Sequence, residues 1–366
     1  MDTAAERSAN PLPGCWPARY QLLDGWRGLA SFLVLLFHLE LLGSGHEAVM
    51  LFFVISGYCI AAAADSAQRH QLTFGAFIAR RLRRIYPPYF LSVMFFLTTR
   101  FAKSWMVGPS GLARFTTWEF LQNLTLTQWL VLTKHPRPNA ADNGTLFVAA
   151  YWSLNYEEQF YLFMGLCLLF VSRRLGAWII PAAVTLLLSV LWNWLFDSLR
   201  TGFFLDYWLH FSLGCLVFYR LVHGTSRAVR VSIDLTLCAV LLIGFSGLYS
   251  PFVSHELIVC SAFAGLLIFL RRWDADLSRI TILRPLFWLG TISYSLYLVH
   301  QFNVRSAAYI GSIVGGDLAW LRLLATIGAH LGVATIFWYF CERPFLNRPL
   351  AQVRRDPELI SQPATS

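Results

Sequence analysis

The stretch WRGLASFLVLLFHLELLG, residues 26–43, contains an apolar run of the length that crosses a lipid bilayer as a helix. A spanning helix needs roughly 20 predominantly apolar residues. Similar windows recur along the chain, and their apolar runs are continuous rather than alternating, which favours helices over barrel strands. The ten windows are residues 26–43, 48–64, 86–102, 150–171, 177–196, 203–221, 231–249, 253–270, 285–310 and 319–340.

The composition agrees with a membrane protein. Of the 366 residues, 57% are hydrophobic and only 13% are charged, whereas soluble domains have roughly 45–50% apolar and about 25% charged residues. This composition excludes an ordinary soluble enzyme, a disordered chain and a disulfide scaffold. We expect an all-α integral membrane protein with about ten transmembrane helices. The more polar segment 115–133 predicts an interfacial or re-entrant helix.

The distribution of Lys and Arg predicts the orientation. Most of the 29 basic residues fall in segments that share one side if the N-terminus is cytoplasmic and the windows alternate. The positive-inside rule then places both termini in the cytoplasm. We expect a cytoplasmic tail at 1–19, a membrane domain at 20–346 with an extracytoplasmic loop at 103–149, and a polar cytoplasmic tail at 347–366.

The net charge of +9 follows from these basic segments, which would meet lipid head groups, so it implies no nucleic-acid partner. The seven cysteines form no CxxC pair, and we expect them to be small buried side chains. The chain also has no HExxH motif. We therefore expect no metal site. The oligomeric state is not encoded in any motif.

Arg27 and His38 are the first functional candidates. They stand eleven residues apart, which is roughly 16 Å along a helix and places the imidazole near the bilayer centre. Ionisable groups inside a membrane are functional candidates by default, and His exchanges protons most readily near neutral pH. The alternatives are a histidine satisfied by a neighbouring helix and an arginine that anchors to head groups.

Glu157 and Glu158 lie in YWSLNYEEQFY, residues 151–161. A buried carboxylate there could hold a histidine tautomer, pair with an arginine or bind a hydroxyl. The alternative is that both acids stay in the head-group zone. Trp152 is expected at the membrane interface.

Four arginines fall within five positions in FIARRLRRIYPPY, residues 77–89, before a proline-marked entry into the third span. Arg81 and Arg84 share a helix face, and guanidinium groups suit phosphates. A topology anchor is the alternative. In the second window, Ser56 and Gly57 permit close helix approach, and packing is the favoured interpretation.

Taken in order, these segments resemble the acyltransferase 3 family of integral-membrane O-acyltransferases, over roughly residues 20–346. The motifs that carry the resemblance are Arg27-Gly28-Leu29-Ala30 with His38, Leu51-Phe52-Phe53-Val54-Ile55-Ser56-Gly57-Tyr58, Arg81-x-x-Arg84-Ile85-Tyr86-Pro87, Trp152-Ser153-Leu154-x-x-Glu157-x-x-Phe160-Tyr161, Ile292-Ser293-Tyr294-Ser295-Leu296-Tyr297-Leu298-Val299-His300 and Glu342-Arg343-Pro344-Phe345. The family often has an acid where this chain has Met50. Any role of that acid is therefore absent from this chain or is filled by Glu47. The resemblance implies the stand-alone form, without an additional extracytoplasmic domain.

The resemblance implies transfer of an acyl group, acetyl in the first instance, from cytosolic acyl-CoA to a hydroxyl of a cell-envelope or exported carbohydrate, at the bacterial inner membrane. Acetyl-CoA is then a co-substrate, and no cofactor is bound permanently. The expected site has catalytic His38 and Glu157, acyl-CoA-binding Arg27, Arg81 and Arg84, and supporting Ser56, Trp152, Ser153, Tyr297, His300 and Glu342. Alternatives are acylation of a small glycosylated metabolite and, outside enzymes, a secondary transporter.

Overall fold

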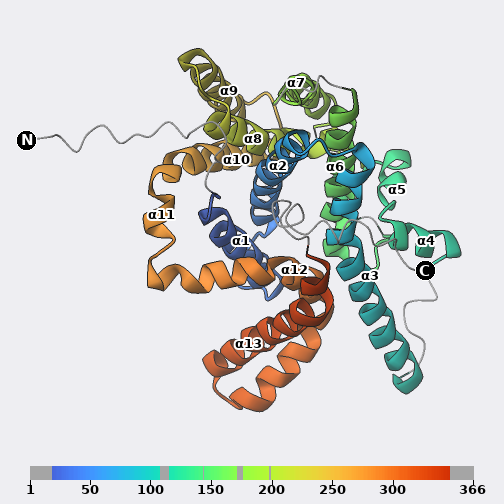
Figure 1. The fold of residues 1–366 in the computed structure, drawn as a ribbon. Coiled ribbons are helices and arrows are strands. Elements are labelled where there is room, and N and C mark those ends of the chain that lie inside the picture. The colour runs from blue at the N-terminus through green and yellow to red at the C-terminus, as the bar shows by residue number, and fades with distance from the viewer. Residues whose placement is uncertain (1–18, 108–114, 143, 171–175, 198, 347–366) are drawn as a thin grey trace, which may run out of the picture.

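The computed structural model describes residues 19–107, 115–142, 144–170, 176–197 and 199–346, and this part of the chain is helical (Figure 1). Within it, every apolar window of the sequence overlaps a long helix, although some windows run several residues past the helix end. The long helices are α1 (Leu22–His38), α2 (His46–Arg69), α3 (Phe74–Val107), α6 (Trp152–Phe170), α7 (Ile179–Leu195), α8 (Leu205–Val222), α9 (Arg227–Phe245), α10 (Pro251–Leu270), α12 (Arg284–Gly315) and α13 (Ala319–Phe337).

Short helices connect or extend them. These are α4 (Thr117–Thr125), α5 (Trp129–Lys134), η2 (Ala140–Asp142), η3 (Ala149–Tyr151), η4 (Arg271–Trp273), α11 (Asp274–Leu277), η5 (Thr281–Leu283), η6 (Trp338–Glu342) and η7 (Arg343–Phe345). No strand occurs in the described residues beyond a single bridge between Arg137 and Arg200.

The all-helical prediction is confirmed. Five segments of the described chain are long and apolar enough to cross a membrane: His46–Arg69, Arg227–Phe245, Pro251–Leu277, Thr281–Gln301 and Ala319–Phe345. The apolar helix α7 is shorter. The number of ten spans and the cytoplasmic side of the termini stay predictions, and the predicted tails at 1–19 and 347–366 lie outside the described residues except for Arg19.

Helix α3 differs from its prediction. It begins at Phe74, well before the apolar window at residue 86, so the arginine cluster is part of the helix, and Pro87 and Pro88 lie inside it. The segment 115–133 forms two short helices instead of one. A capping box between Thr116 and Glu119 starts α4, because the side chain at each position satisfies a backbone N–H of the other.

Glycines let two pairs of helices pack in close contact. A Cβ on Gly57 of α2 would lie 1.9 Å from the carbonyl oxygen of Phe211 in α8, and one on Gly28 of α1 would lie 2.0 Å from that of Leu286 in α12. Only glycine permits such backbone contact. The packing interpretation of Gly57 is therefore confirmed, and the neighbouring Arg27 and Ser56 are held at fixed places between helices.

The start of α1 is tied to α11. The backbone N–H groups of Gln21 and Leu22 donate to the buried carboxylate of Asp274, at 3.1 and 2.8 Å. First-turn N–H groups have no partner within their own helix, so Asp274 satisfies them from a segment distant in the sequence. Arg271 donates to the same carboxylate at 2.6 Å.

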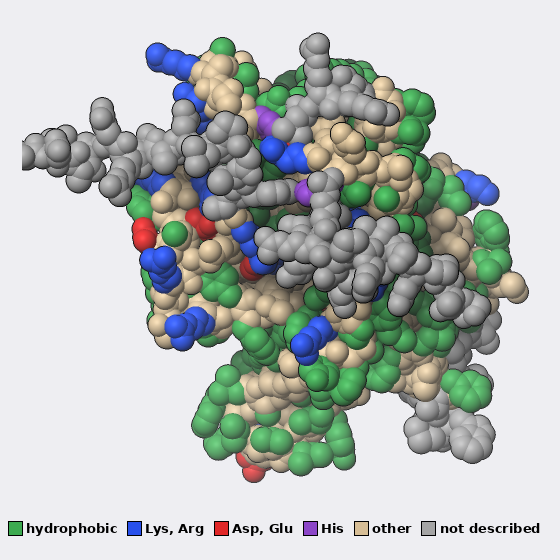
Figure 2. Space-filling model, viewed as in Figure 1, with side chains coloured by type: hydrophobic (Ala, Val, Ile, Leu, Met, Phe, Trp, Pro, Cys, Tyr) green, Lys and Arg blue, Asp and Glu red, His purple; other side chains and the backbone are tan. Residues whose placement is uncertain are grey.

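The second half of α12 runs side by side with α13, and the two project from the other helices (Figure 1), whereas the first half of α12 packs against α1. Hydrophobic side chains cover much of this projection on the face shown in Figure 2. Exposed apolar residues there include Ile313, Trp320, Leu324 and Ile336. A contiguous apolar surface of this kind suits lipid.

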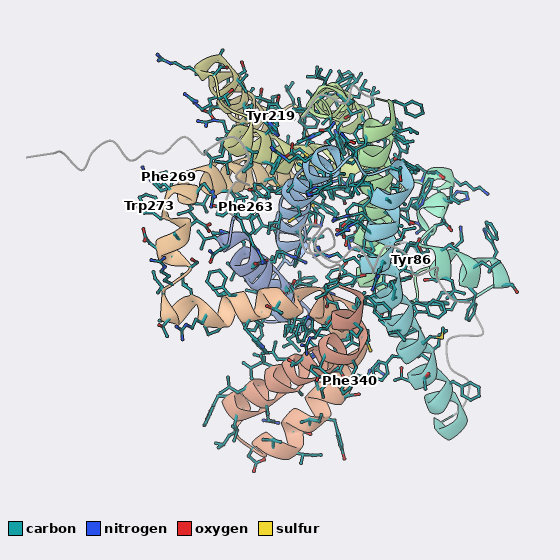
Figure 3. The ribbon with its side chains drawn as sticks, viewed as in Figure 1. Tyr86, Tyr219, Phe263, Phe269, Trp273 and Phe340 are labelled. Carbon is teal, nitrogen blue, oxygen red and sulfur yellow. The ribbon has the colours of Figure 1, made fainter. Side chains whose placement is uncertain are left out.

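Phe269 and Trp273 lie together at the end of α10 (Figure 3). The guanidinium of Arg272 lies over both rings, 4.3 and 3.7 Å from their centroids.

Candidate active site

Three neighbouring pockets are lined mainly by α1, α2, α3, α6, α8 and α12, and the middle one shares lining residues with each of the other two. The first, named here the arginine pocket, has a volume of about 530 Å³ and includes Arg27, Arg81 and Arg84. Arg19 and Arg271, which sequence reasoning did not single out, also line it. Each of these two is paired with an aspartate, Arg19 with Asp24 and Arg271 with Asp274.

The middle pocket is narrower, at about 80 Å³. It shares the three predicted arginines with the arginine pocket and adds polar groups from α2, α6 and α12. Its polar and charged lining is Arg27, Ser56, Arg81, Arg84, Ser153, Glu157, Tyr161, Ser293, Tyr294 and Tyr297. Glu157 accepts hydrogen bonds from the hydroxyls of Tyr161 at 2.6 Å and Ser56 at 3.4 Å.

The histidine pocket, about 310 Å³, contains His38 and Trp152 and shares Val49 and Tyr297 with the middle pocket. Asn139, Ala141 and Ala149 from the predicted loop 103–149 also line it. Tyr297 divides the two pockets. Its hydroxyl donates to the carbonyl of Ala150 and therefore accepts from Ser153 at 2.7 Å. The middle pocket thus lies between the other two: it shares its arginines with the arginine pocket, and Tyr297 separates it from the histidine pocket.

The tautomer of His38 follows from its contact with Val34. Nδ1 lies 3.0 Å from the Val34 carbonyl oxygen. Since a carbonyl only accepts, Nδ1 carries the proton, and in the neutral ring Nε2 is left as the basic, nucleophilic atom. The half-buried His38 ring also meets the His300 ring edge to face, with centroids 4.7 Å apart. His300 is buried, and its own Nδ1 lies near the carbonyls of Leu296 and Tyr297.

The structure separates His38 from Glu157. They line different pockets, and among the described residues no hydrogen bond joins them. Since Nδ1 of His38 is taken by Val34, the expected alternative in which Glu157 orients His38 has no contact to support it. Glu157 instead shares the middle pocket with three guanidinium groups.

Two further acids lie outside the three pockets. Glu158 accepts a hydrogen bond from Tyr86 at 2.5 Å, on the α4 side of α3, where Tyr86 also donates to the Thr125 carbonyl at 3.1 Å (Figure 3). Glu342 is buried and accepts from the backbone and hydroxyl of Ser295 at 3.1 and 2.5 Å. Glu342 therefore links η6 to α12, as a structural support would.

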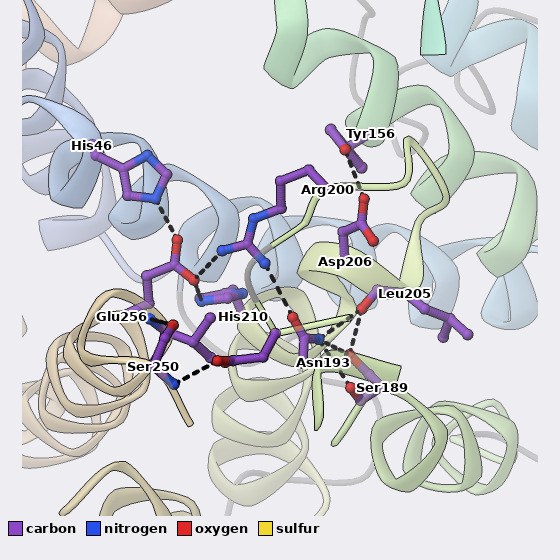
Figure 4. Close-up of polar contacts among 12 residues, drawn as sticks. His46, Tyr156, Ser189, Asn193, Arg200, Leu205, Asp206, His210, Ser250 and Glu256 are labelled. Carbon is purple, nitrogen blue, oxygen red and sulfur yellow. Dashed lines mark hydrogen bonds and ion pairs between the residues drawn. The ribbon is translucent and has the colours of Figure 1, made fainter. Parts of the chain in front are cut away.

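Sequence reasoning missed a buried polar cluster beside the histidine pocket (Figure 4). Glu256 of α10 is 2% exposed and binds His46, which also lines that pocket. Arg200 donates to Glu256 at 3.0 Å and to Asn193 at 3.1 Å. Burial disfavours the charge of Arg200, but Glu256 raises its pKa above the usual range. An acid inside the apolar window 253–270 was the signal that could have identified this cluster.

The comparisons with known proteins agree with the family resemblance. A family model described as an acyltransferase domain matches residues 20–340. The Rhizobium meliloti exopolysaccharide production protein ExoZ is 29% identical over 322 residues, which cover 84% of this chain and 92% of ExoZ. No solved structure matches.

Two larger relatives are named for peptidoglycan. Bacillus subtilis YrhL, provisionally named a peptidoglycan O-acetyltransferase, is 27% identical over 88% of this chain and 54% of its own length. The Listeria monocytogenes peptidoglycan O-acetyltransferase OatA is 25% identical over 88% of this chain and 55% of its own length. The chain thus spans about half the length of these two relatives. With its apolar helices and a family match over most of its length, the chain is an integral membrane protein that belongs to the acyltransferase 3 family of acyltransferases.

Proposed function

We propose that this protein is a multi-pass enzyme of the bacterial inner membrane that moves an acetyl group from acetyl-CoA to a hydroxyl of a cell-envelope or exported carbohydrate. The observation that carries the proposal is the series of three neighbouring pockets, with a cluster of arginines at one end and His38 at the other. A carbohydrate acceptor is supported by the names of the relatives, which refer to peptidoglycan and exopolysaccharide.

The arginine pocket suits the phosphates of the donor. Planar guanidinium groups bind phosphate through paired charge-assisted hydrogen bonds. Arg27, Arg81 and Arg84 have no aspartate or glutamate in salt-bridge contact within the described residues, whereas Arg19 and Arg271 do. The three predicted arginines are therefore the ones left for an anionic ligand, and the cytosolic side assigned to them by the sequence matches a cytosolic donor.

The middle pocket, at about 80 Å³, is too small for a nucleotide, and we propose that only the slender acyl-bearing arm of the donor enters it. The donor's phosphates then stay with the arginines while its thioester reaches toward His38. At that point Nε2 of His38 either takes the proton of the acceptor hydroxyl or carries the acyl group briefly as an acyl-imidazole. In the direct case the acceptor oxygen bonds to the carbonyl carbon, the C–S bond breaks, and the thiolate leaves.

Binding of acetyl-CoA tests the donor. Calorimetry on purified protein in nanodiscs should give micromolar binding that is lost in Arg81→Ala/Arg84→Ala. Arg83→Ala is the matched control, because Arg83 lies on the same helix but is exposed and lines none of the three pockets. Folded wild-type protein that binds no acetyl-CoA would overturn the donor. Movement of a solute across the bilayer without release of CoA would favour a transporter instead.

A further inference from the structure

A second histidine faces the histidine pocket. His46, the first residue of α2, lines this pocket together with His38, although the two belong to different helices. The side chain of His46 is 21% exposed and packs parallel to Trp152, with ring centroids 6.1 Å apart. A ligand in this pocket therefore meets two imidazole rings.

Glu256 determines the tautomer of His46. Its carboxylate lies against Nε2 of His46, and it also accepts from Arg200 and lies 3.5 Å from Nε2 of His210. Because a carboxylate paired with arginine only accepts, Nε2 of His46 carries the proton, and Nδ1 of the neutral ring is left as a proton acceptor. Within the described part of the chain, Nδ1 makes no hydrogen bond. A carboxylate that holds one nitrogen while the other faces a hydroxyl is the arrangement of a general base.

The cluster is more elaborate than helix packing requires. Glu256 and Arg200 are each 2% exposed, and burial of a charged pair is rarely a net gain over apolar packing. A neighbouring pair links the same two helices without burial of this kind: Glu47 and His255 lie 3.4 Å apart, and their side chains are 35% and 57% exposed. Only the buried pair presents its histidine to the pocket, since neither Glu47 nor His255 lines it.

We propose that His46, held by Glu256, is the group that binds the acceptor hydroxyl and takes its proton, and that His38 carries the acyl group. This assignment rests on the proposed acetyl transfer. In the first step Nε2 of His38 bonds to the thioester carbonyl carbon, the C–S bond breaks, and CoA thiolate leaves. In the second step the acceptor oxygen bonds to the same carbon, its proton passes to Nδ1 of His46, and the C–N bond to His38 breaks. His46 then returns the proton to water or to the thiolate.

The two histidines are therefore separable by experiment. The first step alone exchanges labelled CoA into acetyl-CoA and needs no acceptor. The second step is measured as acetate formed from water and as O-acetyl product on chitotetraose, a carbohydrate probe. Wild type, His46→Gln, His38→Gln and His255→Gln are compared in nanodiscs, with acetyl-CoA binding measured for each. Gln at position 46 still donates to Glu256 but does not take a proton.

His46→Gln should keep CoA exchange and acetyl-CoA affinity within about twofold and lose about 10²-fold or more of the transfer to water and chitotetraose. Acetyl-His38 should accumulate in this variant and be visible by mass spectrometry of the intact protein. His38→Gln should lose both steps. His255→Gln, which breaks the neighbouring pair of the same two helices, should keep both.

Other outcomes overturn the assignment. Parallel losses of exchange and transfer in His46→Gln and His255→Gln would show that His46 only joins α2 to α10. Wild type that transfers acetyl without exchange, or exchanges it without transfer to water or chitotetraose, would also overturn the assignment of roles. Wild type that binds no acetyl-CoA would instead overturn the proposed function itself, so the two failures are distinguishable.

Discussion

The imidazole rings of His38 on α1 and His300 on α12 meet edge to face, with centroids 4.7 Å apart. The same two helices pack closely at Gly28 and Gly290, ten residues before each histidine, which is about 15 Å along each helix. This close packing sets the alignment of α1 and α12, and the two rings meet further along them. Val34 sets the tautomer of His38, and His300 limits the orientation of its ring.

Replacement of His38 tests the chemistry. His38→Ala should lower acetyl transfer by about 10²-fold or more, because alanine can neither carry the acyl group nor take a proton. The half-buried ring contributes little to folding, so the amount of protein in the membrane and the affinity for acetyl-CoA should be retained. Transfer rate and binding measured on the same nanodisc preparation separate the two effects. Full activity in His38→Ala would contradict the mechanism.

His300 should act through packing. Its ring is buried, and its Nε2 has no hydrogen-bond partner in the described residues. His300→Phe keeps an aromatic ring against His38, so most of the transfer rate should remain. His300→Ala removes that support, and misplacement of His38 should lower the rate by up to about 10²-fold. Equal losses in the two variants would show instead that His300 exchanges protons.

Gly57 should tolerate no side chain. In Gly57→Ala the new Cβ would lie 1.9 Å from the Phe211 carbonyl oxygen, so α2 and α8 must separate, and we expect about 1–3 kcal/mol or more of destabilisation. Thermal unfolding in detergent measures the loss. Gly332→Ala is the matched control, because it is a helical glycine with open space around it, and alanine there should be neutral or slightly stabilising.

The ion pair between Arg200 and Glu256 predicts a non-additive effect on stability. Arg200→Met leaves a buried carboxylate without its main partner, which should destabilise the protein by about 3–5 kcal/mol. Arg200→Met/Glu256→Leu removes both charges and should recover much of that stability while acetyl transfer stays low, because His46 loses its partner. Thermal unfolding and the transfer rate of the same variants measure both effects. Additive losses of stability would show that Arg200 and Glu256 contribute independently and would contradict this prediction.

Much of the fold is readable from the sequence. Apolar windows are local properties, so each of the ten overlaps a helix of the structure, from 26–43 with α1 to 319–340 with α13. The residues at which the helices begin and end were less predictable from the sequence. Helix α3 begins at Phe74 because its amphipathic first turns, with the four arginines, are stabilised by packing and not by hydropathy.

The sequence by itself also determined the membrane class, the order of the family motifs and the spacing that puts Arg27 and His38 on one helix. Only the tertiary structure decided which of these residues share a pocket. It separates Glu157 from His38, and it brings His46 and Glu256, 210 positions apart, into contact beside His38. Helical periodicity is set by neighbours along the chain, whereas such contacts depend on how whole helices pack, through close approaches such as Gly57 with Phe211.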